Sequence, residues 1–181
     1  MRRLVMAVGA LAIALEAVAQ SPSSQNVPKI DPAWLRADTV TKTAEFDLTA
    51  GLTGYRGALN FNGYADGQLA LIVPLGWNVV MHFKNNDAVL PHSAEVIPDV
   101  KPLPLGPVDP AFDRAVTIKL MQGLQAREVD DIRFVANRAG NFIIFCAVPG
   151  HGAAGMWIRF VVSDTVRRPS LAATSGGGGG S

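Results

Sequence analysis

Three residues in the last third of the chain carry side chains that could bind a soft metal ion. Cys146 is the only cysteine among 181 residues, and His151 and Met156 follow it at intervals of five residues. Thiolate, imidazole and thioether groups are all ligands of copper. A single cysteine cannot form a disulfide within its own chain. It is therefore paired with another chain, left as a free thiol, or used in the chemistry of a site. The regular spacing favours use as a ligand.

The residues on either side of this segment alternate between apolar and polar side chains, which predicts two strands. Alternation over 141–148 places Cys146 on the apolar face, and alternation over 156–162 does the same for Met156. Taken one at a time, a buried cysteine and a methionine at a strand end are ordinary core residues. With His151 in the loop that joins the two strands, all three side chains can meet at one end of a sandwich.

His92 is the candidate for a fourth ligand. It shares a strand face with Ala94 and Val96, and that face excludes Ser93 and Glu95. The sequence therefore predicts that His92 points inward, as Cys146 and Met156 do.

A second histidine, His82, competes with His92 for this role. In the predicted strand around it, His82 has the same parity as Asn78 and Lys84, on the polar side. We therefore expect His82 to lie on the surface and to take no part in metal binding.

Two histidines, one cysteine and a weakly bound methionine are the ligand set of a mononuclear blue copper centre. Thiolate and thioether suit Cu(I), imidazole suits both oxidation states, and an intermediate geometry lets an electron pass with little rearrangement. A structural zinc site usually has more thiolates at paired spacing, which a single cysteine cannot supply. The sequence thus predicts one copper ion, Cu(I) or Cu(II), bound by His92, Cys146, His151 and Met156, with no catalytic residue.

Short alternating segments dominate the rest of the chain and predict an all-β protein. The expected strands are residues 45–50, 57–63, 68–74, 77–83, 115–121, 128–136, 141–148 and 156–162. A short helix is expected within 31–38, with Asp31 as its N-cap, and five prolines between Pro98 and Pro110 predict a long surface loop. Many short strands separated by turns favour one antiparallel Greek-key β-sandwich or barrel.

The segments VVMHFKNNDAVLPHSAEV and GNFIIFCAVPGHGAAGMW resemble the two ligand-bearing regions of the cupredoxins, the small blue copper proteins. The likeness covers about residues 31–163 and is greatest to the sulfocyanins, with a ligand loop similar to that of the rusticyanins. It implies a cupredoxin-like fold and the same copper ligands. Many cupredoxins have asparagine after the first histidine ligand and serine or threonine after the cysteine, whereas this chain has Ser93 and Ala147 at these positions. The hydrogen bond that ties the two ligand loops together is therefore expected to be weakened or rebuilt.

The two ends of the chain differ from its middle in composition. Arg2 and Arg3, 12 apolar residues and the small residues near Ala19 predict a signal peptide, with an uncleaved anchor as the alternative. Export would place the protein in the periplasm or elsewhere outside the cytoplasm. The expected division is signal peptide 1–19, linker 20–30, cupredoxin domain 31–166 and flexible glycine-rich tail 167–181.

The predicted function is that of a soluble, exported electron carrier that is not itself an enzyme. It would carry one electron between respiratory-chain partners, from a membrane or periplasmic donor to an acceptor such as a terminal oxidase. Cleavage of the signal peptide would remove two arginines and one glutamate and leave a formally neutral protein, which argues against binding to nucleic acid. We expect a monomer that contacts a membrane only if its first segment is retained. The redox partner is expected to dock over residues 149–155, beside Leu90 and Pro91.

The alternative to an electron carrier is a copper-binding protein for delivery or storage, whereas copper enzymes fit the sequence poorly. A protein for copper delivery or storage usually has exposed, exchangeable methionine or cysteine ligands, whereas these ligands lie on core faces. A multicopper oxidase needs more than the three histidines present, and a binuclear centre needs a second cysteine. A thiol nucleophile would need a nearby base, and residues 132–163 contain no aspartate or glutamate.

Overall fold

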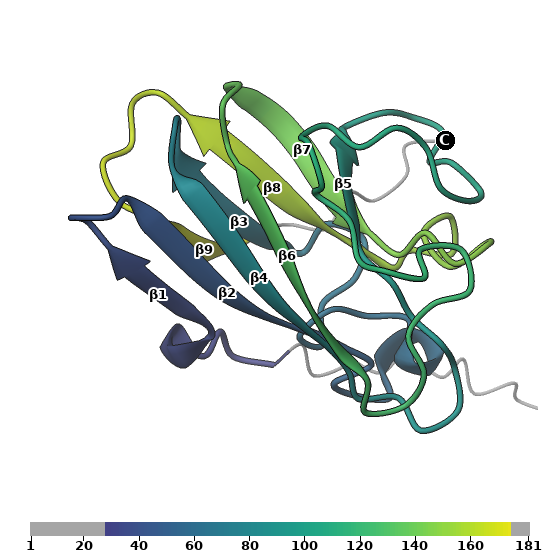
Figure 1. Ribbon diagram of the computed structural model, residues 1–181. Coiled ribbons are helices and arrows are strands. Elements are labelled where there is room, and N and C mark those ends of the chain that lie inside the picture. Colours follow the sequence, from purple (N-terminus) through teal and green to yellow (C-terminus); the bar gives the residue numbers. More distant parts are fainter. Residues whose placement is uncertain (1–27, 175–181) are drawn as a thin grey trace, which may run out of the picture.

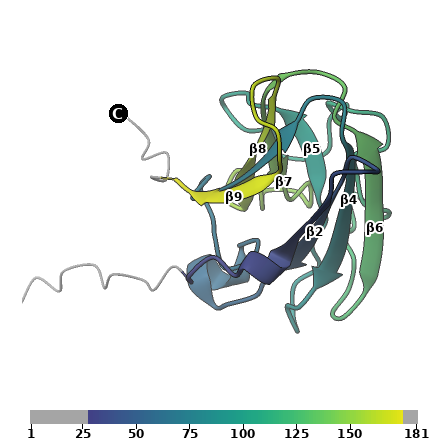
Figure 2. The ribbon, with the colours of Figure 1, turned by 90° about the vertical axis from the view of Figure 1, so that its left-hand side faces the viewer.

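The computed structural model describes residues 28–174, which form a sandwich of two β-sheets (Figures 1 and 2). The first sheet has the strand order β1-β2-β4-β6, and the second has the order β5-β7-β8-β3-β9. The strands are β1 (Leu35–Asp38), β2 (Thr43–Ala50), β3 (Leu69–Pro74), β4 (Asn78–Asn85), β5 (Glu95–Pro98), β6 (Val129–Val135), β7 (Gly140–Phe145), β8 (Trp157–Ser163) and β9 (Ser170–Ala173). The predicted all-β sandwich is confirmed.

The alternation seen in the sequence decides which side chains enter the space between the sheets. Along β2 every second residue is buried, including Phe46 and Leu48, because one face of the first sheet packs on the core and the other meets solvent. Aromatic rings from both sheets and from one connecting loop fill the interior, where Phe112 stacks on Phe134 with ring centroids 5.2 Å apart. Burial of these rings is the main stabilising term for the fold.

The expectation of purely antiparallel pairing was wrong for two of the seven strand pairs. β2 pairs parallel with β4, and β3 pairs parallel with β8. The chain leaves the first sheet after β2, forms β3 in the second sheet, and returns to form β4 in the same direction as β2. Alternation identifies the buried face of a strand and contains no information about the direction of its neighbour.

Two of the expected strands do not form. Residues 57–63 make only isolated bridges beside the 3-10 turn η2 (Tyr55–Ala58), and residues 115–121 also make only an isolated bridge. In the first segment the buried amide of Asn60 donates to the backbone carbonyls of Thr53 and Tyr55, which stabilises a folded loop. In the second segment Lys119 has a φ of 52°, which an extended strand cannot contain.

The short helix expected at 31–38 is a single 3-10 turn. It is η1 (Pro32–Trp34), and the side chain of Asp31 accepts a hydrogen bond from the Ala33 N–H at 2.9 Å, as an N-cap does. The chain then becomes extended as β1. The N-cap was therefore placed correctly, and the helix was predicted too long.

A long irregular segment, residues 99–128, follows β5, and part of it covers the outer face of the second sheet. We call it the covering loop. Beneath it lies a second apolar cluster that consists of Ile97, Ile143, Phe145, Ala147 and Trp157, with Leu103 and Leu120 of the loop packed against it. The face of β5 opposite the sandwich interior is therefore buried as well.

Glu95, on this covered face, is fully buried. Its Oε2 accepts a hydrogen bond from the Val108 N–H of the covering loop at 3.4 Å, and its Oε1 has no hydrogen-bond partner among the described residues. Burial raises the pKa of Glu95 to about 7, and the nearby charge of Asp109 acts in the same direction.

The C-terminal boundary of the domain lies further along the chain than expected. β9 occupies residues 170–173 of the predicted flexible tail and pairs antiparallel with β3, while Leu171 packs against the main core. The predicted signal peptide, most of the linker and the run of glycines lie outside the described residues. Within the described part of the chain, no helix has the length and apolar character required to cross a membrane.

Candidate metal centre

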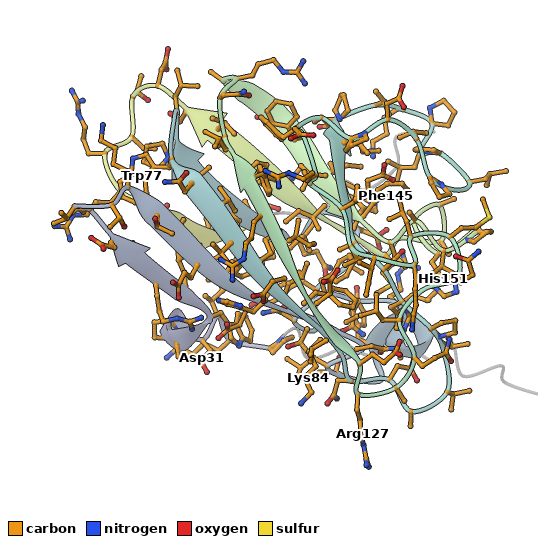
Figure 3. All side chains as sticks on the ribbon, in the orientation of Figure 1. Asp31, Trp77, Lys84, Arg127, Phe145 and His151 are labelled. Carbon is orange, nitrogen blue, oxygen red and sulfur yellow. The ribbon has the colours of Figure 1, made fainter. Side chains whose placement is uncertain are left out.

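The predicted ligands lie at one end of the sandwich. Figure 3 shows His151 among the loops at the end opposite Trp77. The ligand atoms of His92, Cys146 and His151 all lie within 4.8 Å of one another. These residues come from three places in the chain: the segment that follows β4, the end of β7, and the loop between β7 and β8.

Both imidazole rings turn the same nitrogen toward the sulfur. The Cys146 Sγ lies 3.9 Å from Nδ1 of His92 and 3.6 Å from Nδ1 of His151. Cys146 and His92 are fully buried, whereas His151 is partly exposed. His151 is therefore the member of the cluster that meets solvent.

The hairpin between β7 and β8 determines the positions of Cys146, His151 and Met156. The Cys146 N–H donates to the Met156 carbonyl at 3.0 Å, and the Met156 N–H donates to the His151 carbonyl at 3.1 Å. The side chain of Met156 is fully buried in the main core. The backbone thus places Met156 directly beside Cys146 and His151, with its side chain in the core.

Two positions in this hairpin require glycine because neighbouring groups leave no room for a side chain. A Cβ on Gly152 would lie 2.4 Å from the ring of Phe145, and a Cβ on Gly155 would lie 2.5 Å from a carboxylate oxygen of Asp66. Gly155 also has a φ of +105°, which side-chain-bearing residues rarely adopt. The small residues of the loop therefore allow it to fold tightly over the end of β7.

Ser93 links the two ligand-bearing regions. Its N–H donates to the Cys146 Sγ at 3.4 Å, and its Oγ accepts a hydrogen bond from the Ala147 N–H at 3.2 Å. The link expected to be weakened or rebuilt is therefore present in a different form, in which a hydroxyl group replaces the amide side chain.

The segment before His92 is held by buried polar side chains. Asn85, at the end of β4, donates to the carbonyls of Leu90 and Leu124 at 2.9 Å, and the backbone of His92 pairs with that of Leu124. The carboxylate of Asp87 lies 3.1 Å from Nε2 of His92, on the side of the ring away from Cys146. The position of His92 is therefore fixed both by its backbone and by its ring.

Asp87 was not among the residues singled out from the sequence. It belongs to the NND segment, whose composition indicated only a turn between two strands. The available signal was its position five residues before a candidate ligand, which is short enough for a turn to fold the carboxylate back onto the ring.

Burial favours the neutral forms of both rings and of the thiol when no cation is present. It lowers the pKa of His92, against an opposing effect of Asp87, and it lowers the pKa of His151 with a contribution from His92. Burial also raises the pKa of Cys146 to about 11. Neutral imidazoles are ready to bind a metal, and a bound cation would displace the thiol proton, since metal ligands bind in their deprotonated forms.

The donor set fits a single copper ion. One sulfur and two nitrogens face a common point, and a thioether-bearing residue lies beside them in an apolar setting. Soft sulfur ligands combined with imidazole select copper over the hard cations, which prefer oxygen ligands.

The remaining expectations concern residues away from the cluster. His82 lies on the outer face of the first sheet, where its Nδ1 is 2.7 Å from a carboxylate oxygen of Asp131, so its surface position is confirmed. On the rim of the cluster, Ala153 and Ala154 are exposed, and Leu90 and Pro91 are partly buried.

Comparison with known proteins agrees with this geometry. Residues 33–173 match the sulfocyanin (SoxE) domain family. A sulfocyanin of Sulfolobus acidocaldarius is 29% identical over 118 residues, which are 61% of this chain and 58% of that protein. The match thus spans well under two thirds of the relative's length.

Two solved structures share the fold. A reduced rusticyanin superposes with a TM-score of 0.54 at 24% identity, over 67% of this chain and 80% of its own. A rusticyanin from Thiobacillus ferrooxidans gives a TM-score of 0.50 at 22% identity, over 67% of this chain and 82% of its own. The resemblance to the cupredoxins is confirmed, and because the family match covers most of the sequence, the chain belongs to the sulfocyanin family of cupredoxins.

Proposed function

We propose that the protein is an electron carrier that binds one copper ion through His92, Cys146, His151 and Met156. The observation that supports this proposal most strongly is the convergence of one buried thiol and two neutral imidazoles within 4.8 Å. A copper ion bound there would alternate between Cu(I) and Cu(II) and so accept and release one electron.

The protein residues have separate tasks in this function. The backbone of the β7–β8 hairpin orients three of the ligands, and the two N–H and hydroxyl contacts of Ser93 hold the sulfur and the following residue in place. Because side chains that are packed and hydrogen-bonded cannot rearrange freely, the site changes little when its charge changes. Full burial of His92 and Cys146 excludes water and disfavours ligand exchange, which counts against metal delivery or storage.

The exposed part of His151 is the proposed point at which the electron enters and leaves the protein. Small and apolar residues lie near it. Ala153 and Ala154 are exposed in the same loop, and the exposed Leu105 is held beside this loop because its carbonyl accepts a hydrogen bond from the Gly150 N–H at 2.8 Å. A small apolar rim suits brief contacts with a redox protein, in which release must be fast. We propose that the partner docks over residues 149–155 with Leu90 and Pro91 beside them.

The proposal includes export of the protein, which rests on the sequence of residues 1–19. A carrier outside the cytoplasm would meet a donor at a membrane or in the periplasm and pass the electron to an acceptor such as a terminal oxidase.

Copper loading of the purified protein tests the proposal. One copper ion per chain should give an intense visible band from thiolate-to-Cu(II) charge transfer, with reversible one-electron voltammetry. Cys146→Ser should abolish the band, and the parent loaded with Zn(II) should be colourless because Zn(II) has no redox chemistry. A band that survives Cys146→Ser would overturn the ligand assignment. Copper that binds without reversible voltammetry would overturn the proposed role as an electron carrier.

A further inference from the structure

Asp87 is a nearly buried carboxylate whose two oxygens face different groups. Its Oδ1 accepts hydrogen bonds from the N–H groups of Val89 and Leu90, at 2.8 Å and 3.2 Å. Its Oδ2 lies 3.1 Å from Nε2 of His92, and its side chain is 8% exposed. The carboxylate therefore joins the turn after β4 directly to the ring of a proposed copper ligand.

The contacts of Asp87 determine which nitrogen of His92 carries the proton. Two backbone N–H groups converge on Oδ1, and these groups can only donate. A carboxylate is an acceptor on both oxygens, so the ring nitrogen beside Oδ2 must be the donor in this hydrogen bond. In a neutral imidazole only one nitrogen is protonated, so the proton on Nε2 leaves Nδ1 bare toward the Cys146 Sγ, 3.9 Å away.

We infer that Asp87 is a positioning residue that selects the copper-binding tautomer of His92 and, by its negative charge, favours the oxidised form of the site. The second half of this inference rests on the proposed function, whereas the first half concerns the protein alone. A carboxylate that accepts from a ligand imidazole makes that imidazole a stronger donor to the metal. A negative charge close to the site also stabilises Cu(II) relative to Cu(I), because Cu(II) carries one more positive charge. The effect is strong here because the surroundings are buried and screen the charge weakly.

An amide in place of this carboxylate could not make the same contacts. Asparagine has one acceptor oxygen and one NH₂ donor. If its oxygen accepted from Val89 and Leu90, its NH₂ would face the protonated Nε2 of His92, and in the flipped orientation its NH₂ would face the two backbone donors. Asp87→Asn therefore changes the charge and also breaks one set of hydrogen bonds, while the size of the side chain stays almost the same.

The outer face of the first sheet offers a matched control. Asp131 also contacts a histidine ring, with 2.7 Å between its Oδ1 and Nδ1 of His82, but both side chains are exposed. Asp131→Asn removes the same charge from a histidine–aspartate pair that does not include a proposed ligand.

Nitrogen NMR of the metal-free parent protein tests the tautomer without any substitution. At pH 8 the ring of His92 should carry its proton on Nε2, and in Asp87→Asn this preference should weaken or reverse. A parent in which Nδ1 of His92 carries the proton would overturn the inference, even if the variants failed to fold.

Voltammetry of the copper-loaded proteins tests the effect of the charge. Asp87→Asn should raise the reduction potential clearly more than Asp131→Asn does. Equal potentials in the two variants would overturn the electrostatic role of Asp87. A parent without the visible copper band would overturn the proposed function instead, whereas a blue parent with an unmoved potential in Asp87→Asn would overturn only the role given to Asp87.

Discussion

The molecule contains two histidine–aspartate pairs that differ mainly in their surroundings. His82 and Asp131 face each other across β4 and β6 on the outer face of the first sheet, with side chains 36% and 44% exposed. His92 and Asp87 lie in one connecting segment at the end of the sandwich, with side chains 0% and 8% exposed. The N···O distances are similar, at 2.7 Å and 3.1 Å.

The comparison shows that burial, and not the contact distance, distinguishes the His92–Asp87 pair from the His82–Asp131 pair. Around His82 other charged groups compete, since Glu45 lies 3.8 Å from Nε2 and Arg133 contacts Asp131, and water screens all of them. Around His92 the ring is fully buried and Asp87 is held by two backbone N–H groups, so the hydrogen bond to Nε2 is fixed, and from it we infer one tautomer. An exposed pair contributes little to stability or to chemistry, whereas the same pair in the interior can position a proposed copper ligand.

The largest expected effect separates the two histidines. His92→Ala removes a proposed ligand and leaves Asp87 without its partner, so the copper-loaded protein should lose or strongly distort its visible band. His82→Ala should leave the band unchanged and lower the free energy of unfolding by less than about 1 kcal/mol, because the pair is exposed. Absorption spectra and urea unfolding check both outcomes. The reverse pattern would show that the first ligand is His82.

A second buried acid, Glu95, sharpens the comparison because it lacks the partners that Asp87 has. Its folded-state pKa of about 7 lies above the ordinary value of 4.5, so the folded protein favours the neutral form. This contribution to stability is complete below the ordinary pKa and is lost as the pH rises through about 7. The loss amounts to about 3 kcal/mol at 1.36 kcal/mol per pKa unit.

Glu95→Gln mimics the neutral acid and should remove this part of the pH dependence. Relative to the parent, the variant should gain about 3 kcal/mol of unfolding free energy between pH 4 and pH 8, as measured by urea unfolding. Parallel stability curves for parent and variant would show that Glu95 ionises as easily in the folded protein as in the unfolded chain.

Met156 tests whether the inner side of the metal end supplies a fourth donor. Met156→Leu replaces a weak sulfur donor by an apolar group, which favours Cu(I), so the reduction potential should rise, and Met156→Gln should lower it. The exposed Met121 provides the control, and Met121→Leu should not change the potential. Voltammograms of Met156→Leu and Met121→Leu that coincide would deny Met156 an axial role.

The smallest expected effect concerns the surfaces of the two regions. Ala153→Glu places a charge on the rim of His151 and should slow electron self-exchange between copper-loaded molecules, with partial recovery at high salt. Val129→Glu places the same charge on the outer face beside His82 and should leave the rate unchanged. The spectrum should not change in either variant. Equal self-exchange rates in the two variants would mean that the electron leaves by another route.

Much of the candidate site could be predicted from local sequence. Cys146 and Met156 occupy inward positions of strands whose alternation is clear, and a hairpin necessarily brings the ends of its two strands together. The same parity distinguished His92 from His82, and the structure places the first in the interior and the second on the surface. These inferences succeeded because they depend only on the alternation of neighbouring residues.

The tertiary structure decided which distant residues surround the cluster. The parallel pairing of β2 with β4 and of β3 with β8 depends on how the chain crosses between the sheets, and side-chain alternation does not record it. The burial of Glu95 depends on the covering loop. The prolines of this loop predicted an irregular backbone but did not predict the surface on which the loop packs. The contact between Asp87 and Nε2 of His92 likewise depends on a turn that folds back onto the ring. By itself, the sequence determined the types, the order and the inward faces of the proposed ligands, because these are local properties of the chain. Only the three-dimensional packing determined the partners of each ligand, because hydrogen bonds and burial depend on which segments meet in space.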